Sequence, residues 1–136
     1  MELGFIENYV GDDGISILAE QVASMDKLKR VYLNLAFNDA KTYGLIKTIK
    51  AFLPRSYESL HLSLSSNEFR DPEVKLIEGH LATLIQKNEH FNLDFTDTAI
   101  SKQEMKKLED IFAEGNKKHG KSTKLSVNSI IPEEKP

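Results

Sequence analysis

The stretch Val31-Tyr-Leu-Asn-Leu-Ala-Phe-Asn38 decides the fold, because its pattern of an apolar residue, two alternating leucines and an asparagine returns elsewhere. Full copies are Leu60-His-Leu-Ser-Leu-Ser-Ser-Asn67 and Met1-Glu-Leu-Gly-Phe-Ile-Glu-Asn8, and partial copies begin at Phe91 and Thr123. The five starts, at residues 1, 31, 60, 91 and 123, are separated by 30, 29, 31 and 32 residues. Self-similarity at such a constant interval is typical of a repeat protein.

Within each copy the apolar residues alternate, which is the period of a strand with one buried face. Strands are therefore predicted near residues 2–6, 31–35, 60–64, 91–95 and 123–127. Between the copies the period becomes helical. The second repeat, for example, places Leu45, Thr48 and Phe52 at the i, i+3, i+7 spacing of one helix face.

Helix ends are also marked in the sequence. Asp71 precedes a proline, a residue that is well tolerated at the first helical position. Ser101 and Glu104 have the spacing of a capping box, in which each side chain accepts the backbone N–H of the other residue. The stretch from Gly115 to Gly120 is expected to end the fourth helix at about residue 114.

These patterns predict an α/β fold of four strand–helix units and a last strand. Right-handed crossovers make the strands parallel and place the helices on one side of the sheet. Units of this kind stack into a solenoid, because none buries its apolar face alone. We expect one domain over residues 1–130, followed by a short polar tail over residues 131–136.

The repeat resembles the leucine-rich repeat family, in its ribonuclease-inhibitor-like class with a long period and a helix in each unit. The matching motif LxxLxLxxN runs over residues 28–38, with Tyr57 replacing the first leucine of the copy over residues 57–67. The resemblance implies that Asn8, Asn38 and Asn67 form a ladder that satisfies backbone groups at the turns. Thr98 and Ile130 depart from the motif, so this ladder should weaken toward the C-terminus. The family also implies protein recognition without catalysis by the repeats.

Composition excludes several classes. The 136 residues carry 18 Lys and Arg against 21 Asp and Glu, a net charge of −3 that attracts neither nucleic acid nor an anionic membrane. There is no cysteine, so disulfides and thiolate metal sites are excluded. No apolar run approaches the ~18 residues of a membrane span, and the first residues do not resemble a signal peptide. An intracellular protein is expected, cytoplasmic or part of a cytoskeletal assembly.

The free face of the predicted sheet is the first candidate binding surface. Reading the second and fourth residues of each strand gives two columns across it: Glu2, Tyr32, His61, Asn92 and Lys124, then Gly4, Asn34, Ser63, Asp94 and Ser126. Acidic residues outnumber Lys124 there, so the face should repel nucleic acid. Tyr32, Phe37 and His61 are the expected anchors, because aromatic side chains dominate binding hot spots. Alternatively, Phe37 packs into its turn and Tyr32 only covers the sheet.

The N-terminal end of the stack is a second candidate surface. Its first strand would leave an unpaired edge beside the apolar residues Leu3 and Phe5. A partner or another copy is expected to cover this edge by strand addition. The full predicted partner-binding set combines the two surfaces: Leu3, Phe5, Tyr32, Asn34, Phe37, His61, Asn92 and Asp94.

Three chemical motifs match parts of the sequence but lack the context that their chemistry requires. Residues 115–122 fit G-x-x-x-x-G-K-[ST], but a phosphate-binding loop of this type precedes a helix, and here a predicted helix comes first. His61, Ser63 and Asp94 could be drawn as a hydrolase triad, but a flat sheet offers no oxyanion hole. The four histidines lack metal-ligand spacing. No cofactor and no metal are expected.

The sequence therefore favours a non-catalytic protein–protein interaction module, an adaptor or a structural subunit of a larger assembly. The alternative is a regulator of an enzyme such as a GTPase. The basic residues around Lys117 to Lys124 are read as a solvated loop, with contact to phosphate or to an acidic partner as the alternative.

Overall fold

The computed structural model describes residues 2–4, 11–36, 38, 40–67 and 69–129. Strands and helices alternate along this part of the chain. In order they are β1 (Glu2–Gly4), α1 (Gly11–Ala23), β2 (Arg30–Asn34), α2 (Thr42–Ala51), β3 (Ser59–Ser63), α3 (Asp71–Lys75), α4 (Glu78–Lys87), β4 (His90–Thr98), α5 (Lys102–His119) and β5 (Lys124–Ser129). No helix in the described ranges is both long enough and apolar enough to cross a membrane.

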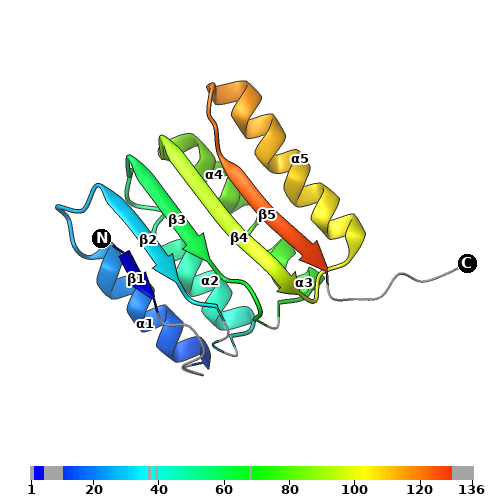
Figure 1. Cartoon of the computed structure of the whole chain (residues 1–136), viewed down its shortest axis with the longest axis horizontal. Coiled ribbons are helices and arrows are strands. Elements are labelled where there is room, and N and C mark those ends of the chain that lie inside the picture. Colours follow the sequence, from blue (N-terminus) through cyan, green and yellow to red (C-terminus); the bar gives the residue numbers. More distant parts are fainter. Residues whose placement is uncertain (1, 5–10, 37, 39, 68, 130–136) are drawn as a thin grey trace, which may run out of the picture.

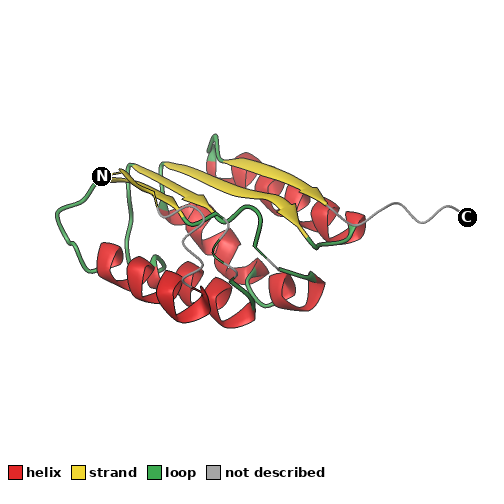
Figure 2. Cartoon of the chain, turned by 60° about the horizontal axis from the view of Figure 1, so that its bottom comes forward, coloured by secondary structure: helices red, strands yellow, loops and turns green. Residues whose placement is uncertain are grey.

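The described strands form one parallel sheet whose spatial order is the order of the sequence, from β1 at one edge to β5 at the other (Figure 1). All the helices lie beneath one face of this sheet, and the opposite face carries none of the described elements (Figure 2). The predicted α/β class with a parallel sheet is thus confirmed.

The core lies between the sheet and the helices. Leu33, Leu62 and Leu93 occupy paired positions on neighbouring strands, and all three are buried. Burying a leucine stabilises a fold by about 1.5–3 kcal/mol. The helical stripe also points inward, because Leu45, Thr48 and Phe52 are all fully buried. The structure therefore confirms that the apolar residues predicted on the strands and on this helix face the core.

Asn67 links two neighbouring repeats. Its Oδ1 accepts the backbone N–H groups of Asn38 at 3.1 Å and Ala40 at 2.9 Å. Its Nδ2 donates to the carbonyl of Leu35 and to two carbonyls of its own turn. Thr98, at the same position of the next repeat, donates only to Phe95 of its own turn. The ladder therefore weakens at Thr98 as predicted, while Asn8 and Ile130 lie outside the described residues.

A second set of links joins the helix entries. Asp12 Oδ1 accepts the backbone N–H of Lys41 at 2.5 Å, and Asp71 Oδ1 accepts that of Ser101 at 2.7 Å. Ser101 Oγ in turn accepts the backbone N–H of Glu104, which is one half of the predicted capping box. The other half is replaced, because Asp71 from the preceding repeat takes the N–H that Glu104 was expected to bind.

Helix α5 continues past its predicted end at residue 114. Gly115 lies inside the helix, where a Cβ atom would come within 2.6 Å of Ile85 Cγ2 on α4. This glycine therefore permits close helix packing and does not stop the helix. Gly120, with φ of 62°, provides the left-handed C-cap. The third helical segment also differs from the prediction, because it is divided into α3 and α4.

Candidate functional site

The free face of the sheet presents the two predicted columns. Tyr32, His61, Asn92 and Lys124 are paired in register, as are Asn34, Ser63, Asp94 and Ser126. The structure therefore confirms which of these residues are neighbours. Most of these side chains are partly or fully exposed, whereas the leucines between them are buried on the helix side. The side chains of the two columns therefore lie on the side of the sheet opposite to the core.

Tyr32 and His61 form a stacked aromatic pair. Their ring centroids are 4.2 Å apart and the ring planes differ by 26°. Such a pair arises because adjacent strands lie about 4.8 Å apart, which brings rings at paired positions face to face. Burial lowers the pKa of His61, an effect that the nearby Asp94 carboxylate partly opposes. Burial therefore favours the neutral form of the His61 ring.

Asp94 lies in the middle of β4, on the same free face as this pair, and is held in a defined orientation. Its Oδ1 accepts the backbone N–H of Thr96 at 3.0 Å and the Thr96 hydroxyl at 2.8 Å. Its Oδ2 accepts only a long hydrogen bond of 3.4 Å from Ser63 Oγ. No cation among the described residues forms an ion pair with Asp94. One oxygen of a positioned, partly buried carboxylate therefore remains available to a ligand.

These groups border a shallow depression of about 210 Å³ on the free face. It is lined by residues of β2, β3, β4 and β5: Tyr32, His61, Asn92, Leu93, Asp94, Lys124 and Ser126. Four of the predicted partner-binding residues thus meet in one place, namely Tyr32, His61, Asn92 and Asp94. We refer to this depression as the free-face site.

The remaining predicted site residues do not join it. Asn34 lies on the same face, but its Oδ1 accepts the backbone N–H of Ala36 at 3.2 Å and so serves the turn. Phe5 and Phe37, with the side chain of Leu3, lie outside the described residues, so docking at the N-terminal edge stays a prediction. Lys124 and Ser126 line the site without having been proposed as binding residues, although the strand columns already contained them.

The triad drawn from the sequence is connected differently. The hydroxyl of Ser63, which is buried, donates to Asp94. A hydrolytic triad needs an accessible serine that contacts the histidine. The contact found here is instead a structural one between neighbouring strands.

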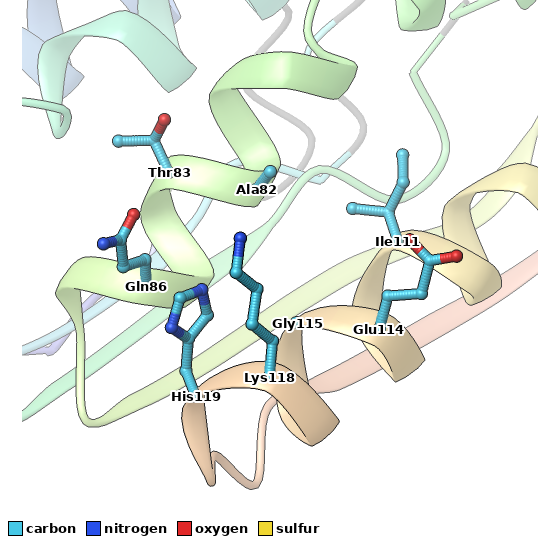
Figure 3. A pocket seen from close by; sticks show the side chains of 8 residues that line it. All are labelled: Ala82, Thr83, Gln86, Ile111, Glu114, Gly115, Lys118 and His119. Atoms are coloured by element: carbon cyan, nitrogen blue, oxygen red, sulfur yellow. The ribbon is translucent and has the colours of Figure 1, made fainter.

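A second depression, of about 270 Å³, lies between α4 and α5 (Figure 3). Gly115, Lys118 and His119 of α5 border it together with Thr83 and Gln86 of α4. Both helices end near this place, so their carbonyl-bearing ends repel phosphate. Residues 115–119 of the phosphate-loop match are helical. The match therefore lacks the loop that its chemistry requires.

A pair of acidic side chains was not foreseen. Glu104 is only 1% exposed, and its Oε1 and Glu78 Oε1 are both buried without a donor among the described residues. Burial raises the pKa of Glu104 to about 7, and the adjacent Glu78 carboxyl acts in the same direction. The sequence indicates only a capping role for Glu104, and that role does not predict a raised pKa. No group of three or more His, Asp or Glu side chains in the described part of the chain is arranged to hold a metal ion.

Neither the family models, nor the curated proteins, nor the solved structures compared with this chain include a match. Its function is therefore argued from the geometry of the free-face site.

Proposed function

We propose that this chain is a leucine-rich-repeat solenoid that acts as a non-catalytic protein–protein interaction module, an adaptor or a structural subunit of a larger assembly. The repeat spacing, the parallel sheet and the Asn67 links between turns support the family resemblance. The binding surface in this proposal is the free face of the sheet.

The Tyr32–His61 stack beside Asp94 is the observation that carries the proposal. Aromatic side chains next to a positioned charge are typical of interface hot spots. The depression of about 210 Å³ is smaller than the ~300–1,000 Å³ of ordinary small-molecule sites. A surface that is open, aromatic and polar suits a protein side chain better than an enclosed substrate.

The two best-placed arginines favour this reading over an activator of a GTPase. Arg55 Nε donates to the carbonyl of Ala23 at 2.9 Å, and Arg30 forms an ion pair of 3.3 Å with Glu58. The contact of Arg55 gives its guanidinium a structural role within the repeats, and Arg30 is engaged in a surface ion pair with a residue just before the next strand. An activator would need an arginine projecting toward the active site of its partner.

Site-specific photo-crosslinking in the native cell tests the proposal. A photoreactive phenylalanine analogue replaces Asn92 at the free-face site, and in a control protein it replaces Tyr43, which is half exposed on α2. We expect a discrete crosslinked protein from position 92, absent from position 43 and lost when Tyr32→Ala and His61→Ala are combined. Equal crosslinking from both positions, or crosslinking only to nucleic acid, would contradict the proposal.

A further inference from the structure

The free-face site combines two features that recognise a planar cation. The stacked rings of Tyr32 and His61 provide an aromatic wall, and Asp94 provides an acceptor oxygen that no described cation occupies. Both Asp94 Oδ1 contacts come from Thr96, two residues further along the same strand, so the carboxylate is positioned before any partner arrives. A preorganised acceptor gains affinity, because little side-chain freedom is lost on binding.

We infer that the free-face site binds an arginine side chain of the partner protein, with the guanidinium against the Tyr32–His61 wall and its N–H groups on Asp94. The inference rests on the proposed function and specifies the chemistry of the partner. Guanidinium is planar, stacks on aromatic faces and donates in a fork that matches a carboxylate. A lysine ammonium has neither the plane nor the fork, so arginine is preferred to lysine.

The ionisation of His61 agrees with this assignment. Since burial favours the neutral form of the ring, the aromatic wall does not repel an incoming cation. Protonation of His61 in mildly acidic solution would add a positive charge beside Asp94. Arginine binding is therefore expected to weaken as the pH falls through the pKa of His61.

Lys124 is the one group at the site that opposes a cation. It is exposed on β5, at the rim of the depression, whereas Asp94 is partly buried and fixed. An exposed ammonium on a flexible stem can turn toward solvent at small cost. Lys124 also supplies the decisive test, because an acidic ligand would depend on this lysine and a basic ligand would be repelled by it.

The first experiment titrates the full chain with blocked amino acids and follows its backbone amide resonances by NMR. The probes are N-acetyl-arginine amide, the corresponding lysine and glutamate amides, and the neutral citrulline amide. We expect saturable shifts at Tyr32, His61 and Asp94 with the arginine probe, and at least threefold weaker binding of the other three. Absence of arginine-specific shifts at these positions, or tighter binding of the glutamate probe, would overturn the inference.

Variants then assign the effect to the two charged residues. Asp94→Asn keeps the Oδ1 acceptor for Thr96 and should weaken arginine binding about tenfold, and Lys124→Ala should strengthen it two- to threefold. Asp97→Asn is the matched control, since it removes the same charge from an exposed residue of the same strand. If Lys124→Ala weakens the binding, or if Asp97→Asn acts as strongly as Asp94→Asn, the site does not select a cation as argued.

A library of random displayed peptides separates this inference from the proposed function. Peptides are selected on the full chain and depleted on the variant with Tyr32→Ala and His61→Ala. Enrichment of arginine at one position supports the inference. Peptides that require the free face but contain no arginine would overturn the inference and leave the proposed function standing. A third outcome, in which neither the peptides nor the crosslinks depend on this face, would overturn the proposed function as well.

Discussion

Asn67 Oδ1 accepts the backbone N–H of Asn38 at 3.1 Å, across the boundary between the second and third repeats. The same side chain also donates to the carbonyl of Leu35 at 3.0 Å, so one amide serves both a donor and an acceptor of its neighbour. All of these groups are buried, so water could not replace these hydrogen bonds if the Asn67 side chain were removed. The asparagine is therefore a structural element of the stack.

We predict that Asn67→Ala lowers the free energy of unfolding by about 2–4 kcal/mol, because several buried backbone groups lose their partner together. Chemical denaturation measures the change. Thr98→Ala is the matched control at the same position of the next repeat, and we expect it to cost about 1 kcal/mol for its single bond within the turn. Equal losses in the two variants would contradict the assigned role.

Leu62→Ala should destabilise the protein by about 2–5 kcal/mol, the range of buried leucine truncations. Leu62 is fully buried in the central strand, with Leu33 and Leu93 on either side. Thermal and denaturant unfolding give the value. A loss below about 0.5 kcal/mol, typical of a surface change, is incompatible with this strand register.

The contribution of Glu104 to stability should fall as the pH rises from about 4.5 to about 7. Glu104 has a pKa of about 7 in the folded protein and 4.5 as its ordinary value, so the folded state binds more protons within this interval. The stabilising effect is fully present below pH 4.5 and lost above about pH 7, with a total of about 3 kcal/mol from this group. Glu104→Gln should remove this contribution and be more stable than the natural protein at pH 8.

The control for this pH experiment is Glu109→Gln, which changes an exposed carboxylate on the same helix. Its stability profile should keep the slope of the natural protein between pH 4.5 and 7. If Glu104→Gln keeps that slope as well, Glu104 does not carry the titration.

Two glycine-to-alanine changes should act in opposite directions. Gly115→Ala places a methyl group 2.6 Å from Ile85 Cγ2, so overpacking outweighs the gain in helix propensity and the net loss should be about 1–2 kcal/mol. Gly79→Ala on α4 meets nothing within 4 Å and should stabilise by about 0.5–1 kcal/mol. Unfolding measurements that gave the same sign for both would refute the packing role of Gly115.

Much of the fold can be predicted from the sequence because each repeat has the same pattern of an alternating strand followed by a helix with one apolar face. The alternation along each strand predicts which side chains point inward. The constant spacing of the repeats predicts which residues of adjacent strands are neighbours, and the predicted row of Tyr32, His61 and Asn92 is confirmed. Relations between repeats were harder to predict. Asp71 takes the N–H of Ser101 from the preceding repeat, and this replaces the local capping box.

The failures share one physical cause. A glycine near a helix end and a glycine at a close helix contact are identical in sequence, so the sequence predicts a helix stop at Gly115 where the structure has a contact with Ile85. The buried pair of Glu78 and Glu104 likewise depends on how two helices pack. The stacking of Tyr32 on His61 required only the strand register, which explains why this part of the site was predicted.

The alternation along each strand also has a consequence for how such a surface can change. Tyr32, His61 and Asn92 each lie between two buried neighbours of their own strand, yet their side chains point away from the packing beneath the sheet. Substitutions at Tyr32, His61, Asn92 and Lys124 can therefore accumulate one strand at a time without loss of the scaffold. The sheet offers an array of independently replaceable positions, from which a new specificity could be selected or designed while the hydrophobic layer stays untouched.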